Sequence, residues 1–275
     1  MPELPEVETY VRDLTPLLRG RTVNGVTILW PRIIAAPTVD EFMRNIIGQQ
    51  FATFGRRGKY MLLGLASGDT LIVHLRMTGR VLLYEQPVLP DKHTHVVLDL
   101  VDGGQIHYQD SRKFGRLWLV ADPASVLHKL GEEPLGDGFG AATLAAKVTG
   151  RNASVKALLL DQSVVAGVGN IYAVESLFLA GIHPARPGNT LHSHEIEKLH
   201  KAIQTVLAHA IAHHGSSLGR SSLQNYARPG GEAGEFQGEH KVFQRTGEPC
   251  VSCGEQIQRI VITQRSTHFC PVCQQ

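Results

Sequence analysis

The sequence predicts an α+β protein in which an N-terminal helix and an antiparallel β-sandwich precede a helical region and a metal-binding hairpin. Short apolar runs between residues 26 and 120 are separated by Gly and Asp, with almost no helix-length segment between them, which is typical of an antiparallel sandwich. Apolar residues recur at helical spacing between residues 154 and 211. All four cysteines lie between residues 250 and 273, which argues against a disulfide framework spread over the fold.

The first helix is predicted to follow Pro5. Apolar residues recur at helical spacing from Val7 to Leu18, and Pro16 is expected to kink or fray the last turn. Proline suits the first helical position, and acidic residues in the first turn interact favourably with the helix dipole. On this interpretation the first six residues are an ordinary helix start.

The same residues allow a second, chemical interpretation. Met1 is normally removed when proline follows it, and Pro2 would then carry a free secondary amine. An α-amino group titrates at about pH 7.7–8.0, so a fraction of it is unprotonated and nucleophilic near neutrality. Such an amine can attack a carbon such as a sugar C1′ and form an iminium, while the carboxyl of Glu3 moves protons.

The predicted strands of the sandwich lie at residues 26–30, 60–65, 70–75, 96–101, 105–108 and 116–120. Three charged or polar turns stand out between them, at residues 55–59, 74–79 and 110–115. Each is compatible with a solvated loop. Together they offer cations for phosphates, and they carry Met77 and Phe114, which could wedge into a base stack.

Residues 122–150 are rich in Gly, Ala, Asp and Pro, and we expect an interdomain linker with a short helix there. Three further helices are expected: one over residues 155–161 capped by Ser154, one capped by Asn170 and ended by Gly181, and a longer one that Ser193 opens and Gly215 ends.

A Gly-Val-Gly-Asn turn at residues 167–170 joins the first two of these helices. Its N–H groups and the Asn170 amide could hold a phosphate, as in a helix-turn-helix contact with a DNA backbone, and a simple capped turn explains the same residues. A dinucleotide loop fits poorly, because the third glycine and the preceding strand are missing. Residues 215–239 show no periodicity, and such a segment is usually functional or disordered.

The most specific motif is Cys250-x2-Cys253-x16-Cys270-x2-Cys273. Two Cys-x2-Cys knuckles joined by a hairpin close a tetrahedral site of four sulfur atoms, for which zinc is the common ion. Because protein ligands fill all four positions, one structural zinc ion is expected. Arg265 lies near the predicted hairpin tip and is a candidate to contact DNA.

The bulk properties set limits on function. The chain has 275 residues, enough for two modest domains, and 43% of them are hydrophobic. Its formal net charge of +2 permits a nucleic-acid partner without requiring one. No apolar run is long enough for a bilayer and no signal-peptide pattern is present, so we expect a cytoplasmic protein without a membrane partner.

These motifs together resemble the formamidopyrimidine-DNA glycosylase family of bacterial base-excision repair enzymes. The matching stretches run in order over nearly the whole chain: residues 2–9 (Pro-Glu-Leu-Pro-Glu-Val-Glu-Thr), Lys59-Tyr60, His74 with Met77, residues 110–115, residues 168–172 (Val-Gly-Asn-Ile-Tyr), Arg265-Ser266-Thr267 and residues 270–273. The related endonuclease VIII branch usually starts Pro-Glu-Gly-Pro, whereas this chain has leucine in the third place.

The resemblance implies a bifunctional DNA glycosylase and AP lyase. Such enzymes remove oxidised purines, notably 8-oxoguanine and formamidopyrimidines, from duplex DNA after flipping the nucleotide, and then cut the strand by β,δ-elimination. The implied organisation is a catalytic β-sandwich domain (residues 1–121), a linker (122–150), a helix-two-turn-helix region with a lesion-recognition loop (151–239) and a zinc finger (240–275). The expected protein is a monomer with no small-molecule cofactor, associated with the nucleoid when it acts.

The resemblance also implies roles for individual residues. Pro2 attacks C1′, Glu3 is the general acid/base, and Glu6 stabilises positive charge at C1′. Lys59 resembles the lysine assigned to β-elimination and Arg265 the arginine assigned to δ-elimination, although both could simply clamp phosphates. The residues matching DNA-contacting positions are His74, Met77, His93, Arg112, Phe114, Arg151 and Asn170; of these, Met77, Arg112 and Phe114 match those that fill the gap and probe the opposite base.

In one stretch the chain departs from the family pattern. After residues 215–218 a similar stretch, Gly219 to Leu223, follows, so the lesion-capping loop is predicted to be several residues longer. This length supports the alternative of an endonuclease VIII-like enzyme that acts on oxidised pyrimidines. A non-catalytic DNA-binding protein would leave Pro2, Glu3 and Lys59 unexplained, and a zinc-ribbon interaction module would account only for the last forty or so residues.

Overall fold

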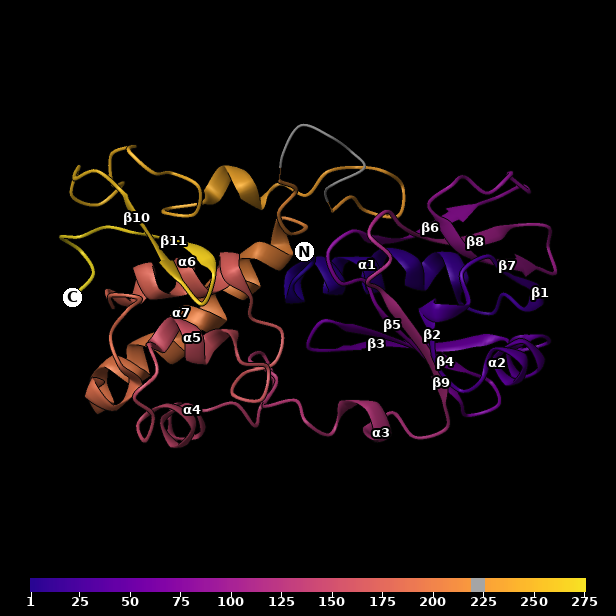
Figure 1. Cartoon of the computed structure of the whole chain (residues 1–275), viewed down its shortest axis with the longest axis horizontal. Coiled ribbons are helices and arrows are strands. Elements are labelled where there is room, and N and C mark those ends of the chain that lie inside the picture. Colours follow the sequence, from indigo (N-terminus) through magenta and orange to yellow (C-terminus); the bar gives the residue numbers. More distant parts are fainter. Residues whose placement is uncertain (219–225) are drawn as a thin grey trace. The chain divides into compact units, whose positions relative to one another are not determined.

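A computed structural model describes residues 1–218 and 226–275, and the chain divides into two compact units (Figure 1). The first unit comprises residues 1–128 and 214–235, and the second comprises residues 129–213 and 236–275. The stretch from Gly219 to Leu223, predicted to lengthen a loop, lies outside the described residues. The domain boundaries proposed after residues 121, 150 and 239 stay predictions.

The first unit is a β-sandwich, as predicted. Its five-stranded sheet has the order β2-β9-β5-β4-β3, with β2 Ile34–Ala36, β9 Arg116–Val120, β5 Thr70–His74, β4 Tyr60–Leu65 and β3 Phe51–Arg57. Its four-stranded sheet has the order β1-β7-β8-β6, with β1 Val23–Ile28, β7 Thr94–Leu100, β8 Gln105–Asp110 and β6 Gly79–Tyr84. Neighbouring strands are antiparallel, except that the short β2 pairs with β9 in parallel.

Helix α1 (Leu4–Leu18) packs against β3 and β4 and contributes to the core of the sandwich. Its apolar stripe is buried, which is why the helical periodicity was visible in the sequence. The helix continues past Pro16 to Leu18, so the proline does not end it. Helix α2 (Val39–Ile46), the single turns α3 (Ala124–Leu127) and η1 (Pro31–Ile33) complete the regular structure of this unit among the described residues.

The second unit contains α4 (Ala141–Val148), α5 (Val155–Leu160), α6 (Asn170–Ala180) and α7 (Ser193–Ala212), with short 3-10 turns η2 (Gly188–Thr190) and η4 (Phe236–Glu239). Helix α6 packs against α5, α7 and the hairpin of β10 (Gln258–Ile262) and β11 (Arg265–Phe269). The three helices predicted for this region, α5, α6 and α7, are therefore present. Within residues 1–218 and 226–275, no helix combines the length and apolar character needed to cross a bilayer.

The start of α6 corrects one prediction. Gly169, rather than Asn170, occupies the cap position, and Asn170 is the first helical residue. Its side chain donates instead to the Ser266 carbonyl of the hairpin, with a donor–acceptor distance of 3.1 Å. A tertiary contact has thus replaced the local cap. The predicted end at Gly181 is confirmed, because this residue adopts the left-handed conformation (φ 73°) that favours glycine.

Candidate functional site

The first turn of α1 is organised around the carboxylate of Glu6. One of its oxygens accepts the backbone N–H of Glu3 at 2.7 Å, and the other accepts the backbone N–H of Ser216 at 2.8 Å. Glu3 and Glu6 are 3% and 1% exposed, so these bonds form away from water. Hydrogen bonds from N–H groups to an ionised carboxylate are stronger than those between neutral groups. The carboxylate therefore joins the residue next to Pro2 to a segment more than two hundred positions away.

Gly215 allows this contact to form. Its φ of 76° lies in the left-handed region, and a Cβ at this position would lie 2.6 Å from Glu6 Oε1. A larger residue would be strained and would also displace the Glu6 carboxylate. The glycine after α7 was predicted as a helix stop, and its contact with Glu6 had no counterpart in the local sequence pattern.

Lys59 lies in the two-residue turn between β3 and β4 and is buried. Gly58, the first central residue, has a φ of 55°, as a hairpin turn of type II′ requires. Arg56 lies in the turn at residues 55–59 that was predicted to offer cations for phosphates, but it is bound to Glu8 of α1 at 3.1 Å and donates to the Gly58 carbonyl, also at 3.1 Å. Helix α1 thereby holds the turn that carries Lys59.

His74 ends β5 beside this turn and is 5% exposed. Burial, followed by the charges of Arg76 and Lys59, lowers its pKa to about 3. The backbone N–H of Arg76 donates to His74 Nδ1 at 2.9 Å, which leaves the proton of the neutral ring on Nε2. The ring also packs edge-on against Tyr60, with 4.4 Å between ring centroids. At neutral pH His74 is therefore an uncharged hydrogen-bonding group.

Asp110 anchors the loop that carries Arg112 and Phe114. Its buried carboxylate accepts the backbone N–H of Arg112 at 3.1 Å, that of Gly115 at 2.7 Å and the hydroxyl of Thr78. The guanidinium of Arg112 lies over the ring of Phe114, 4.9 Å from its centroid. Phe114 itself is 49% exposed, which is unusual for a ring of this size and leaves it able to contact a ligand.

The other side of this loop is held by Trp30. The Nζ atom of Lys113 lies 4.0 Å from the centroid of the Trp30 ring, and Arg32 lies over the same ring at 5.7 Å. Such cation–π contacts contribute about 0.5–2 kcal/mol each. Trp30 carried no signal of this role in the sequence.

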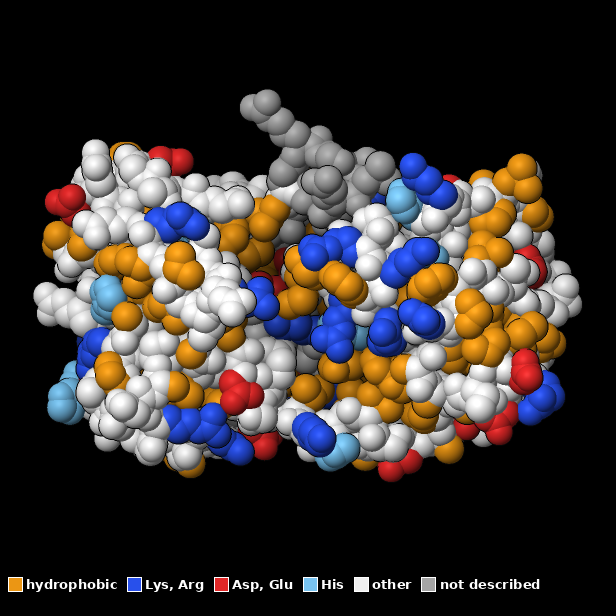
Figure 2. Space-filling view, viewed as in Figure 1, with side chains coloured by type: hydrophobic (Ala, Val, Ile, Leu, Met, Phe, Trp, Pro, Cys, Tyr) orange, Lys and Arg blue, Asp and Glu red, His pale blue; other side chains and the backbone are white. Residues whose placement is uncertain are grey.

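A depression of about 390 Å³ brings the N-terminus and the exposed apolar side chains together, and its lining residues are Met1, Arg76, Met77, Phe114 and Arg116. Figure 2 shows Lys and Arg side chains gathered beside hydrophobic ones on this unit. Met1 is 40% exposed, whereas Pro2 is buried. His93 lies with Thr78, Arg80 and Asp110 around a separate, smaller hollow.

In the second unit, two side chains converge on the β11 strand. Asn170 of α6 and Lys156 of α5 both donate to the Ser266 carbonyl at 3.1 Å, and Lys156 also donates to Thr267 Oγ1 at 2.6 Å. Lys156 is fully buried. In the sequence, the only sign of this burial was the position of Lys156 inside an apolar run. Arg265, next to Ser266, is exposed beside the two-residue turn Thr263-Gln264, where both residues have positive φ. The helices thus fix the strand at the two residues that follow Arg265.

The remaining predicted DNA contacts of this unit are differently placed. Arg151 is half exposed and pairs with Asp161 at 3.2 Å. The turn at residues 167–170 follows helix α5 rather than a strand, which excludes a dinucleotide loop. The N–H of Gly167 donates to Gln162 Oε1 at 3.0 Å, so this amide stabilises the turn itself.

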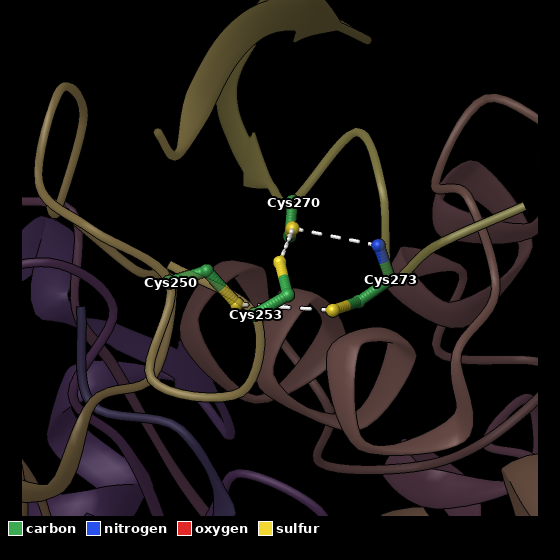
Figure 3. A group of neighbouring side chains, drawn as sticks. All are labelled: Cys250, Cys253, Cys270 and Cys273. Atoms are coloured by element: carbon green, nitrogen blue, oxygen red, sulfur yellow. Dashed lines mark hydrogen bonds between the residues drawn. The ribbon is translucent and has the colours of Figure 1, made fainter. Parts of the chain in front are cut away.

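The four cysteines cluster at the base of the hairpin (Figure 3), and their sulfur atoms all lie within 4.8 Å of one another. The Sγ atoms of Cys250 and Cys273 are 3.9 Å apart and those of Cys253 and Cys270 are 3.5 Å apart. A tetrahedral zinc site with Zn–S bonds of about 2.3 Å requires sulfur separations of about 3.8 Å, whereas a disulfide requires about 2.05 Å. The donor set therefore fits one structural zinc ion.

The electrostatics of the cluster also favour a cation. A hydrogen bond with the Cys253 thiol, followed by burial, raises the pKa of Cys273 and so disfavours its thiolate in the absence of a cation. A divalent ion at the centre would reverse this effect and stabilise the thiolates.

Three family models match the chain in succession. They are the formamidopyrimidine-DNA glycosylase N-terminal domain over residues 1–117, the formamidopyrimidine-DNA glycosylase H2TH domain over residues 130–222, and the zinc finger found in FPG and IleRS over residues 247–275. The chain belongs to the formamidopyrimidine-DNA glycosylase family. It is therefore a DNA glycosylase with AP lyase activity, a DNA-repair enzyme with an H2TH domain and one structural zinc ion.

Curated relatives match over the full length. Formamidopyrimidine-DNA glycosylases of Chloroflexus aggregans and Geobacillus kaustophilus are 48% and 46% identical over 278 and 279 residues, which cover 100% of this chain and 98% and 100% of theirs. A Lactococcus lactis FPG mutant in complex with Fapy-dG containing DNA has a TM-score of 0.92 at 36% identity, with 100% of both chains covered. The L. lactis protein with abasic site containing DNA has a TM-score of 0.91 at 35% identity, with 99% of both covered.

Proposed function

We propose that this chain removes oxidised purines, notably 8-oxoguanine and formamidopyrimidines, from duplex DNA through a Schiff base on Pro2, and then cleaves the strand by β,δ-elimination. The observation that carries this proposal is the N-terminus itself. Met1 lines a depression together with Met77 and Phe114, and the residue after Pro2 is held by a buried carboxylate. Removal of Met1 would open the Pro2 amine to that depression. The Fapy-dG and abasic DNA bound to the L. lactis relative support the substrate class.

The glycosylase step follows from the chemistry of a secondary amine. The Pro2 nitrogen attacks C1′ of the flipped nucleotide, the C1′–N bond breaks, and the base leaves with the electron pair and takes up a proton. Glu3 is the acid and base that moves protons at the sugar. The charge of Glu6, held in the first turn by the N–H groups of Glu3 and Ser216, stabilises the positive charge that develops at C1′.

The lyase step uses an iminium. It forms when the Pro2 nitrogen has lost its proton and its electron pair breaks the C1′–O4′ bond, which opens the sugar ring, while Glu3 gives a proton to O4′. Loss of a C2′ proton expels the 3′ phosphate, loss of a second sugar proton expels the 5′ phosphate, and water then hydrolyses the iminium to free Pro2. We assign the β-elimination to Lys59, whose turn is held by Arg56 and α1, and the δ-elimination to Arg265. Each residue also provides a cation for a phosphate.

DNA contacts complete the proposal. The exposed side chains of Met77 and Phe114, with Arg112 stacked on the ring, fill the gap left by the flipped nucleotide and probe the opposite base. The residues proposed to contact the DNA backbone are His74, His93, Arg151 and Asn170. The zinc ion, held by the four cysteines, cross-links the hairpin that carries Arg265 and takes no part in the chemistry. We further propose that the protein acts as a monomer at the bacterial nucleoid.

Excision under single-turnover conditions on two duplexes tests the substrate class. One duplex contains 8-oxoguanine opposite cytosine and the other contains an oxidised pyrimidine. We expect the purine lesion to be removed at least tenfold faster. Faster removal of the pyrimidine would keep the mechanism and assign the endonuclease VIII-like preference instead. The matched control is the same chain with Met1 retained, confirmed by intact mass, which should form no covalent adduct with either duplex.

A further inference from the structure

One face of α1 contacts the segment that follows α7 at three levels. Glu6, Tyr10 and Asp13 are spaced four and three residues apart, so they lie along one side of the helix. Glu6 accepts the N–H of Ser216, and the ring of Tyr10 packs edge-on against Tyr226 with 5.6 Å between ring centroids. Asp13 pairs with Arg228, which lies two residues after Tyr226. The helix that begins beside Pro2 is thus attached to this segment along most of its length.

The contact farthest from Pro2 is a bidentate ion pair. Arg228 Nε and Nη2 donate to Asp13 Oδ2 and Oδ1 at 2.7 and 2.8 Å, and the two side chains are only 26% and 19% exposed. Exposed ion pairs contribute little, but a partly buried pair in which both guanidinium donors meet both carboxylate oxygens has a defined geometry. This pair therefore fixes the position of residues 226–228 on the helix.

Ser217 carries this restraint back to Glu6. Its hydroxyl donates to the Tyr226 carbonyl at 2.7 Å and accepts the N–H of Gly234 at 2.8 Å, which closes the segment on itself. The preceding residue, Ser216, donates its N–H to Glu6. A continuous series of contacts thus runs from Arg228 through Tyr226 and Ser217 to the carboxylate that holds Glu3.

We propose that Asp13 and Arg228 are positioning residues for the N-terminal nucleophile: their ion pair holds the segment that supplies the Ser216 N–H to Glu6, and so fixes the first turn of α1 beside Pro2. This inference rests on the proposed function, because it concerns the amine that forms the Schiff base. Neither residue contacts DNA in this role. Loss of the pair slows the attack at C1′ without weakening DNA binding.

A second bidentate pair in the same unit provides a matched control. Arg21 donates to Asp102 through Nε and Nη2 at 2.6 and 2.8 Å, nearly the same geometry as that of Arg228 with Asp13. Asp102 lies in the turn between β7 and β8, and among residues 1–218 and 226–275 its side chain accepts hydrogen bonds from Arg21 and from the Gly104 N–H. Asp102→Asn therefore removes a comparable ion pair outside the series of contacts that leads to Glu6.

The test is borohydride trapping on an abasic-site duplex at saturating DNA, with the zinc-loaded full chain after verified loss of Met1. We expect Asp13→Asn and Arg228→Gln each to lower the trapping rate about tenfold, the loss typical of about one charge-assisted hydrogen bond, with an unchanged Kd. The double variant should be no slower than either single one, since the residues act as one unit. The charge swap Asp13→Arg with Arg228→Asp should recover most of the rate, and Asp102→Asn should match the unsubstituted chain.

Each other result contradicts a specific part of this account. Trapping by the single variants at the unsubstituted rate, or an equal loss in Asp102→Asn, would overturn the positioning role. Losses that add in the double variant, or a charge swap as slow as the single variants, would overturn the ion pair as its cause. If Arg228→Gln does not fold, Arg228→Lys decides, since it keeps the charge but lacks the two-pronged donor. Absence of trapping by the unsubstituted chain would instead refute the proposed nucleophile.

Discussion

Replacing Gly215 by alanine should disrupt the first turn of α1 from a distance of two hundred residues in sequence. The φ of 76° costs an L residue about 1–2 kcal/mol. The added Cβ would also lie 2.6 Å from Glu6 Oε1, where an ordinary contact is about 3.4 Å or more, so the carboxylate must move. Losing the Ser216 N–H bond to a charged group adds about 1.5–3 kcal/mol. Gly215→Ala should therefore lower the free energy of unfolding by about 3–5 kcal/mol.

Gly48→Ala separates the two contributions. Gly48 has a φ of 80°, close to that of Gly215, but no atom lies within 4 Å of the Cβ position. This control should lose only the conformational part, about 1–2 kcal/mol. Urea unfolding of both variants, followed by far-UV circular dichroism, measures the difference. The trapping rate on abasic DNA should fall in Gly215→Ala and remain unchanged in Gly48→Ala. Equal losses of stability in the two variants, with equal trapping rates, would refute the proposed contact between residue 215 and Glu6.

Three further predictions concern other parts of the site. Trp30→Ala removes the ring beneath the Lys113 ammonium and frees one side of the loop that carries Phe114. Affinity for a lesion-containing duplex, measured by fluorescence anisotropy, should therefore fall three- to tenfold, which is about the energy of one cation–π contact. An unchanged Kd would contradict this. His74 has a pKa of about 3 in the folded chain and of about 6.5 in the unfolded chain. Only the unfolded state therefore gains this proton as the pH falls below 6.5. The contribution of His74 should lower the free energy of unfolding by about 1.4 kcal/mol for each pH unit. In His74→Gln the pH dependence between 6.5 and 5 should be weaker by that amount, and identical slopes would count against the buried neutral ring. Cys270→Ala should abolish zinc binding, as measured by metal analysis, and should weaken DNA binding, while trapping at saturating DNA persists. Full DNA affinity in verified zinc-free protein would exclude a role for the zinc finger in binding.

Local patterns were sufficient for the features that local residues determine. The cysteine spacing predicted the metal site because each knuckle brings two thiols together over four residues. The stripe of apolar residues predicted α1 because one face of it is buried. Helix α2 was not predicted, although Thr38 and Glu41 form a capping box at its start, because eight residues are too few for a clear period. Strand β3 contains Gly55 and two arginines, so it lacked the apolar alternation of a strand.

The contacts that assemble the site could not be predicted in this way. The bond between Ser216 and Glu6 joins residues 210 positions apart, and the pair of Arg228 with Asp13 joins residues 215 apart. No local propensity specifies such a partner, since the contact depends on how the segment after α7 returns to α1. Asn170 illustrates the same limit at shorter range: its side chain was expected to cap a helix and instead reaches Ser266. The hairpin supplied a hydrogen-bond partner that the local sequence did not indicate.

Peptide mapping of the trapped adduct tests the central claim most directly. After borohydride reduction on an abasic duplex, proteolysis and mass spectrometry would locate the sugar remnant. Lys59 is the competing amine, because the proposed β-elimination also brings its amino group to the sugar. We predict the remnant on the N-terminal nitrogen of a peptide that begins at Pro2, with no modified Lys59. A remnant on Lys59, or on a peptide that still begins with Met1, would contradict the assignment of Pro2 as the nucleophile.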